Sequence, residues 1–380
     1  MSASAVWIPL RAATQCLLAV LSAAACSQTD VDPETARPVA RVAAVDTLLE
    51  SDTIYVARVS RAYMAPDGRT FVTDQVQRRV LEFASDGALL RVFGRSGDGP
   101  GEFRGPTAMS VWGRDSLVVT DLTNRRVSVF RQSDGQFLWH ANGLGSVSSL
   151  GPVGSRLIVA SLSPDSFTTV GILEPGSRTL RPALPLPDSL LRHQLGIASF
   201  PRSVVGVSAT HVVTAVLWSD VVSVFDSALA PQFSFVVPRR TRRAIPVDLD
   251  AALRPVANTS GRSTLMPALI SIEVLRNGWL AFVHKEWIAP PGGISDPTRV
   301  AIEATMHAYV TVVDLSARRA CADIELPTDW SENPQFISVG ETIAGVGHVV
   351  GASARPTLEV RKFELQLDEC DWAPLPVSAS

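Results

Sequence analysis

The sequence has little lysine and no excess of charge of either sign. Of its 34 basic residues only Lys285 and Lys362 are lysines, and the formal net charge at pH 7 is −3. Nucleic-acid-binding proteins carry a basic surface, so the composition gives no support to a nucleic-acid partner. With 380 residues, 46% of them hydrophobic, the chain is long enough to bury a substantial core. We therefore expect a folded protein without a nucleic-acid partner.

Its N-terminal apolar segment is too short to span a bilayer as a stable helix. Residues 16–21 form that segment, Arg11 is the only charge before it, and the small residues 22–25 precede Cys26. This order is typical of an export signal. Small residues immediately before a cysteine resemble the lipobox of bacterial lipoproteins, in which that cysteine is acylated. We expect a signal peptide over 1–25, lipidation of Cys26 and a flexible polar tether over 26–38, with cleavage and secretion as the alternative.

Cysteine is scarce, which limits the possible cross-links and metal sites. Beyond Cys26, the mature chain would hold only Cys321 and Cys370. In an oxidising compartment these two could form one disulfide, closing a loop of about 50 residues and stabilising the fold by about 4 kcal/mol. Two buried thiols are the alternative. No CxxC or paired-histidine spacing accompanies them, so a zinc site is not expected.

The common catalytic motifs are also missing. GxSxG, HExxH and the phosphate-binding GK[ST] do not occur. His211, His284 and His348 are not at equivalent places in the repeats described below, so a histidine-bound metal is not expected. Calcium held by carboxylates stays possible, although no DxDxDG loop occurs. These absences favour a binding protein over an enzyme.

What the sequence does contain is a tandem repeat. Residues 62–93 and 106–139 align with a spacing of 47, which matches Asp74 with Asp121 and Phe83 with Phe130. Each copy predicts four short strands joined by turns, several of them Asp-Gly turns. Fainter copies follow at 154–176, 208–231, 276–287 with 308–320, and 340–350 with 357–365. The repeat therefore predicts six antiparallel four-stranded units.

Such units bury both faces only by stacking on one another, and closing them into a ring removes the exposed ends. The first two copies, with FGRSGDGPGEF between them, resemble the NHL-repeat six-bladed β-propellers, particularly the exported ones of bacteria. The expected fold is all-β, a six-bladed β-propeller of four-stranded antiparallel blades, with seven blades as the alternative. We expect the propeller over 39–372, with 39–50 pairing on the last blade, and a C-terminal tail over 373–380.

The glycine-rich stretch Gly94–Gly105 has a structural explanation in such a ring. It would cross from the outer strand of blade 1 to the inner strand of blade 2, and its glycines would permit sharp bends. Phe103 would then insert between the two blades. We call the side of the ring that holds these crossings the crossing face.

Loops between the second and third strands of each blade end on this same face, where binding is expected. The candidate ligand-binding residues are Asp74, Arg78, Asp121, Asn124, Arg125, Trp218, Asp220, His284, Lys285 and Trp287. The aspartates could instead cap their own loops and pair with the arginines. Neighbouring residues on a strand point to opposite sides, so His284 and Lys285 are not expected to act together. The basic run 238–243 is expected to be a solvated loop, with contact to anionic head groups, glycans or an acidic partner as the alternative.

The function predicted from these features is binding without catalysis. A ring of rigid blades presents many loops on one face, which suits a protein, peptide or glycan partner, while the lipid would anchor the chain to a membrane of the cell envelope. The alternative is a propeller hydrolase or lyase with a metal in the central channel.

Overall fold

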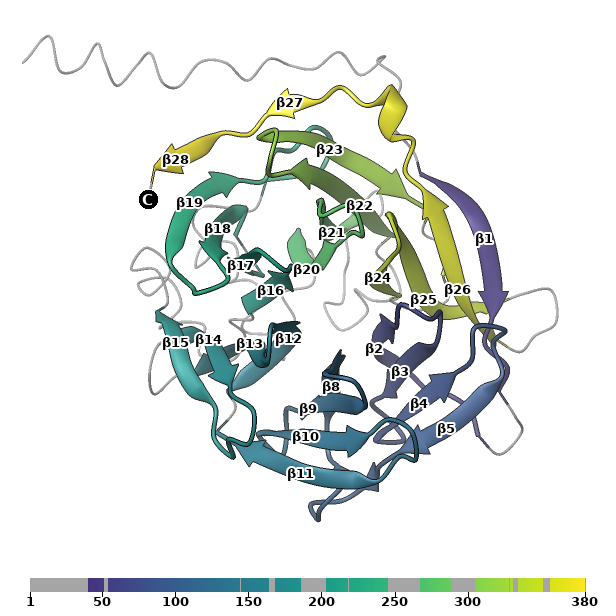
Figure 1. Ribbon diagram of the computed structural model, residues 1–380. Helices are drawn as coiled ribbons and strands as arrows, with labels where there is room; N and C mark the ends of the chain where they lie inside the picture. The colour runs from purple at the N-terminus through teal and green to yellow at the C-terminus, as the bar shows by residue number, and fades with distance from the viewer. Residues whose placement is uncertain are drawn as a thin grey trace, which may run out of the picture. The chain divides into compact units, whose positions relative to one another are not determined.

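Six antiparallel sheets stand as blades around a central channel in the computed structural model (Figure 1). The structure describes residues 40–50, 54–143, 145–163, 168–185, 203–217, 219–244, 267–288, 305–327, 329–330, 334–350 and 356–379. The signal peptide, the tether and Cys26 lie outside these ranges, as does Trp218. The predicted six-bladed propeller is confirmed.

Each blade is a meander whose first strand lines the channel. The bounds of the strands of blades 1 to 3 are β2 (Val59–Met64), β3 (Thr70–Asp74), β4 (Arg79–Phe83) and β5 (Leu89–Phe93); β8 (Pro106–Trp112), β9 (Ser116–Asp121), β10 (Arg126–Arg131) and β11 (Phe137–Asn142); β12 (Ser146–Val153), β13 (Arg156–Ser163), β14 (Thr168–Leu173) and β15 (Arg181–Pro185). The first two repeat copies extend over all four strands of their blades, whereas the copy at 154–176 corresponds to β13 and β14, the second and third strands of blade 3.

Blades 4 to 6 continue the pattern, and the last blade takes its outer strand from the start of the propeller. Their strands are β16 (Ser203–Val207), β17 (His211–Val216), β18 (Val221–Asp226) and β19 (Pro231–Val236); β20 (Ala268–Val274), β21 (Leu280–Ile288), β22 (Thr305–Asp314) and β23 (Arg319–Leu326); β24 (Gln335–Val339), β25 (Thr342–Val350), β26 (Pro356–Glu364) and β1 (Arg41–Thr47).

Among the described residues the core forms six hydrophobic clusters, one between each pair of neighbouring blades. The second strands are buried on both sides: all five residues of β3, TFVTD, are buried. Val72 faces blade 6 and Phe71 faces blade 2, so consecutive side chains serve opposite interfaces. Fully burying a valine or phenylalanine side chain contributes about 1.5–3 kcal/mol, so these two residues stabilise the interfaces on both sides of the blade.

The ring is closed by antiparallel pairing of β1 with β26, in a register that sets Arg41 opposite Glu364 and Thr47 opposite Glu359. Ala40 and Leu48, at the two ends of β1, are buried in the clusters on either side of blade 6. The predicted pairing of segment 39–50 with the last blade is thereby confirmed.

The predicted crossing from blade 1 to blade 2 is also confirmed. Within it, β6 (Arg95–Ser96) and β7 (Glu102–Phe103) pair in parallel. Phe103 is fully buried among residues of both blades, and its ring centroid lies 5.5 Å from that of Phe130. Gly94 has φ +70°, and a Cβ atom there would lie 2.3 Å from the Phe103 ring. Only glycine meets both constraints, because it tolerates a positive φ and leaves room for the ring.

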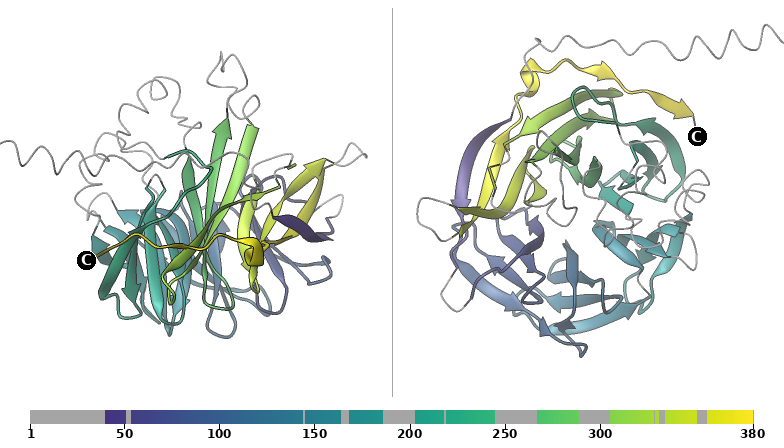
Figure 2. Two further views of the ribbon diagram at one scale, coloured as in Figure 1. Left: turned by 90° about the horizontal axis from the view of Figure 1, so that it is seen from above. Right: turned by 180° about the vertical axis from the view of Figure 1, so that it is seen from behind.

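The C-terminal segment runs along the outside of the ring (Figures 1 and 2). After the 3₁₀ turn η2 (Leu367–Glu369), β27 (Ala373–Pro374) pairs with β23, and β28 (Val377–Ala379) pairs with β19. A disulfide joins Cys370 to the buried Cys321 of β23. Residues 373–379, expected as a tail, therefore add a fifth strand to blades 5 and 4.

Candidate functional site

On the crossing face, Asp121 ends β9 and its carboxylate holds backbone amides of two segments. Oδ1 accepts hydrogen bonds from the amides of Gly105, Thr123 and Asn124 at 3.0–3.1 Å, and Oδ2 accepts one from Arg104 at 2.9 Å. The side chain is fully buried. Asp121 therefore joins its own loop to the incoming crossing, and its oxygens are occupied by the protein itself.

Asp74 has the same role in blade 1. Its Oδ1 accepts hydrogen bonds from the amides of Val76 and Gln77, and its Oδ2 accepts one from Ala57, which precedes β2, at 2.9 Å. Asp74 is also fully buried. Both carboxylates therefore cap loops of their blades by accepting hydrogen bonds from backbone amides, which is the structural role considered for the two aspartates.

The residues after each aspartate shape the same loops. Arg78 and Arg125 adopt left-handed backbone conformations, with φ 57° and 51°. Arg78 Nη1 donates to Ser96 Oγ at 3.1 Å, and Asn124 Nδ2 donates to the carbonyl of Gly97 at 3.1 Å. These side chains hold the crossing in place. Arg125 is exposed on the rim and Asn124 is half-buried, so both are reachable by a ligand on this face.

Between blades 4 and 5 the structure brings together Asp220 and His284, two of the predicted site residues. Asp220 Oδ1 lies 3.6 Å from His284 Nε2 and accepts a hydrogen bond from Arg242 Nη1 at 2.8 Å. His284 is 1% exposed. Burial lowers the pKa of His284, and the charge of Arg242 lowers it further, against the opposing effect of Asp220. His284 is therefore a neutral interior residue and is closed to ligands from solvent.

Arg242 is the centre of this cluster. Its Nε donates to Asp323 Oδ1 at 3.0 Å, and Asp323 also accepts the amides of residues 240–242. Burial opposes ionisation of Asp220, but His284 and Arg242 outweigh it and hold the pKa of Asp220 below its usual range. The expectation of a solvated loop over 238–243 is wrong for Arg242, whose side chain is completely buried. Two carboxylates stabilise its charge: Asp323 on β23 and Asp220 in the loop before β18.

The Glu286 side chain and the Trp287 carbonyl, both at the end of β21, bind Arg243. Glu286 Oε2 accepts a hydrogen bond from Arg243 Nε at 3.0 Å, and Oε1 accepts one from the Tyr309 hydroxyl at 3.2 Å. The carbonyl of Trp287 accepts a hydrogen bond from Arg243 Nη2 at 2.7 Å. The Trp287 side chain is half-buried at the rim. The acid next to His284 is thus engaged in holding segment 238–243.

Lys285 points the opposite way, toward blade 6 and the channel. Its Nζ donates to the carbonyl of Pro334 and lies 5.0 Å from the centroid of the Phe336 ring. Burial lowers the pKa of the Lys285 ammonium well below its usual range, and the charge of Arg61 adds to the effect. The separation of His284 from Lys285, expected from strand geometry, is therefore observed.

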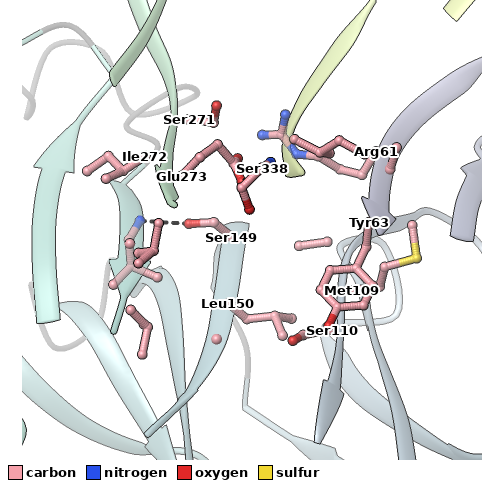
Figure 3. Close-up of a pocket in the computed structure, with 18 of the residues that line it drawn as sticks. Arg61, Tyr63, Met109, Ser110, Ser149, Leu150, Ser271, Ile272, Glu273 and Ser338 are labelled. Atoms are coloured by element: carbon pink, nitrogen blue, oxygen red, sulfur yellow. Dashed lines mark hydrogen bonds between the residues drawn. The ribbon is translucent and has the colours of Figure 1, made fainter. Parts of the chain in front are cut away.

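Two cavities along the channel are lined by residues that the structure describes. The central cavity, of about 230 Å³, is lined by all six inner strands. Figure 3 shows Arg61, Glu273 and Ser338 reaching into it from three different blades. The Ser338 amide donates to Glu273 Oε2 at 3.1 Å. Burial raises the pKa of Glu273, while this hydrogen bond and the charge of Arg61 oppose the rise.

A second cavity, of about 190 Å³, lies at the crossing-face end of the channel. Arg61, Lys285 and Gln335 contribute its polar lining together with Ser60, Gln75 and Thr107. Sequence reasoning missed Arg61, Glu273 and Gln335. The one available signal was a charged or amide residue within an otherwise apolar inner strand, and alternation alone does not show which side of such a strand faces the channel.

No group of three or more histidine, cysteine, aspartate or glutamate side chains that could hold a metal occurs in the described part of the chain. The described residues therefore offer no carboxylate cluster for the calcium ion that the sequence left open. Among the same residues, no helix is long and apolar enough to cross a bilayer.

Comparison with solved structures finds the same fold at very low sequence identity. A member of the DUF4221 family from Bacteroides vulgatus matches with a TM-score of 0.58 and 8% identity, covering 90% of this chain and 98% of that one. A candidate exported protein of Bacteroides fragilis matches with a TM-score of 0.53 and 13% identity, covering 89% and 98%. No family model and no curated protein sequence matches this chain. These similarities show the propeller fold alone.

Proposed function

We propose that this β-propeller is an exported, NHL-like protein that binds a protein, peptide or glycan at its crossing face and channel mouth without catalysing a reaction. Exposed Arg125 and half-buried Asn124 and Trp287 would contact the ligand at the rim. Lys285 would do so inside the channel. Buried Asp74, Asp121 and His284, with half-buried Asp220, would support the surface from beneath.

One observation carries the proposal. The carboxylates that could serve as acids or bases on this face accept hydrogen bonds from backbone amides and arginines, and His284 is buried, whereas the channel mouth offers open space lined by polar groups. A general acid or base must reach its substrate within hydrogen-bonding distance. Groups engaged in this way stabilise the face, and the open cavity beside them suits binding.

Location is proposed from the N-terminal sequence. Lipidation of Cys26 would anchor the chain to an envelope membrane, with the polar tether 26–38 between the lipid and the propeller. In an exporting bacterial host, Cys26→Ser should release the protein from the membrane fraction. Unchanged partitioning of Cys26→Ser would remove the anchor from the proposal, and a soluble wild-type protein would indicate secretion.

Binding without turnover can be tested with arrays of peptides and glycans. Captured ligands are eluted and weighed by mass spectrometry, and metals in the purified protein are measured by elemental analysis. Recovery of unaltered ligand from metal-free protein supports the proposal. Conversion of the ligand together with a stoichiometric, tightly held divalent ion would instead establish the channel hydrolase or lyase.

A further inference from the structure

The crossing-face cavity has an unusual balance of charge. Its eleven described lining residues include two basic side chains, Arg61 and Lys285, and none of the eleven is an aspartate or glutamate. The same lining provides two amide side chains, Gln75 and Gln335. A cavity with this lining attracts an anion, because its low-dielectric walls strengthen the field of the two basic groups.

The two basic side chains are held in position by neighbouring blades. Arg61 Nη1 donates to Gln335 Oε1 at 2.8 Å, which joins blade 1 to blade 6. Lys285 comes from blade 5 and is 2% exposed, held by the Pro334 carbonyl and the Phe336 ring. Because three blades fix these groups before any ligand arrives, binding would cost little ordering of side chains.

The remaining walls of the cavity are mainly apolar. Leu122, Val147, Val204, Leu217 and Ile270 form them together with the hydroxyl residues Ser60 and Thr107, and the volume of about 190 Å³ admits only a small molecule. Typical ligand sites combine such apolar walls with a few oriented polar groups. The ligand that fits this lining has an anionic end for the cations and a compact body for the apolar walls.

We propose that the crossing-face cavity binds a small organic carboxylate through Arg61 and Lys285. The inference rests on the proposed binding function and specifies the chemistry of its ligand. The planar fork of a guanidinium matches the two oxygens of a carboxylate. Inorganic phosphate matches the cavity less well, because it has no apolar body to place against the apolar walls.

Binding in this cavity would be coupled to protonation of Lys285. Burial lowers the pKa of that ammonium, and the charge of Arg61 on β2 lowers it further. The β22 residue opposite Lys285 is Ala308, and β24 contributes the uncharged Gln335 and Phe336. Glu273 on β20 lies in the central cavity with Arg61. A carboxylate placed beside Lys285 would favour its charged form. The protein should therefore take up a proton as the ligand binds.

Isothermal titration calorimetry of the full chain tests this with benzoate and glucuronate as probes, against benzamide and glucose as uncharged counterparts. We expect at least one carboxylate to bind and its neutral counterpart to bind at least tenfold more weakly. The measured enthalpy should differ between buffers of low and high ionisation enthalpy, as proton uptake requires. This comparison uses the unmodified protein, so it does not depend on the folding of a variant.

Two variants locate the site. Arg61→Gln and Lys285→Met should each weaken carboxylate binding by about tenfold or more, since each removes a charged donor. The matched control is Arg95→Gln, because Arg95 is 81% exposed on the same face and outside the cavity. Lys285→Met should also abolish the buffer dependence of the enthalpy. Circular dichroism verifies the fold of each variant.

The outcomes separate this inference from the proposed function. Equal affinities for carboxylates and neutral counterparts, preference for inorganic phosphate, or equal effects of Arg61→Gln and Arg95→Gln would overturn the carboxylate site. If peptides or glycans from the arrays bind and no carboxylate competes with them, the proposed binding function would stand and the carboxylate site would be overturned. A carboxylate that binds through Arg61 and is then converted would retain the site and overturn the non-catalytic function.

Discussion

Arg242 and Asp323 form an ion pair that is completely buried, with Nε 3.0 Å from Oδ1 and both side chains at 0% exposure. They lie 81 residues apart in the chain. The pair attaches the segment after blade 4 to the outer strand of blade 5. Because a buried charge without its partner is strongly unfavourable, this contact makes the joint between the two blades sensitive to substitution.

Arg242→Met should therefore lower the free energy of unfolding by about 3–5 kcal/mol, because Asp323 and Asp220 would lose their shared cation. Urea denaturation measures the loss. The control is Arg239→Met, an exposed arginine of the same segment, for which we expect a change within about 0.5 kcal/mol. Equal small changes in both variants would show that the buried pair contributes no net stability.

A pair of glycines separates backbone strain from close packing. Gly94 and Gly113 have nearly the same φ, +70° and +69°, but a Cβ atom at Gly113 meets nothing within 4 Å. Gly113→Ala should cost about 1–2 kcal/mol for the left-handed backbone alone. Gly94→Ala should cost about 1–3 kcal/mol more, because its methyl group collides with the Phe103 ring. Similar thermal stabilities for the two variants would contradict the packing of Phe103 against Gly94.

The disulfide between Cys321 and Cys370 should be visible by mass spectrometry as two cysteines that resist alkylation until the protein is reduced. Cys370→Ser should lower stability by about 2–4 kcal/mol and increase amide exchange in β27 and β28. Reduced wild-type protein is the matched control and should behave as the variant does. If both cysteines alkylate readily in the oxidised, folded protein, the cross-link is absent.

His284 should make stability depend on pH. The folded protein holds His284 neutral, because burial and the charge of Arg242 lower its pKa. The charges of Asp220 and Asp323 oppose this shift. In the unfolded chain a histidine takes up a proton near pH 6.5. Below that pH the unfolded state binds more protons, so the free energy of unfolding should fall as the pH falls, by at most about 1.4 kcal/mol per unit.

Denaturation midpoints between pH 7.5 and 5 would measure this effect. His284→Gln should flatten the dependence on pH. The control is His211→Gln, which should leave the dependence unchanged, because His211 is only half-buried at the start of β17. A wild-type slope that persists in His284→Gln would assign the effect to other groups.

Local sequence signals predicted the parts of the site that repeat. Asp74 and Asp121 occupy equivalent places 47 residues apart, and the equivalence correctly indicated a common structural role. Phe103 could be placed between blades because a lone aromatic residue within a glycine-rich crossing has one apolar destination. The rim position of Arg125 followed from the same repeat, since a loop after a second strand must end on the crossing face.

Residues without an equivalent in the repeat could not be placed in this way. Arg242 stands in a run of arginines that looks like a solvated loop. Its burial depends on Asp220, in the loop before β18, and on Asp323, on β23. Arg61 and Lys285 come from different blades, so nothing in either local sequence indicates that both line one cavity.

The amino-acid sequence by itself determined the blade and the ring, because alternating apolar residues and Asp-Gly turns act over a few neighbouring positions and recur at regular spacing. Only the tertiary structure decided which charges are buried together and which face the channel. Those outcomes depend on the angle and height at which distant strands meet, and burial then determines whether a charged group stabilises the fold or remains available to a ligand.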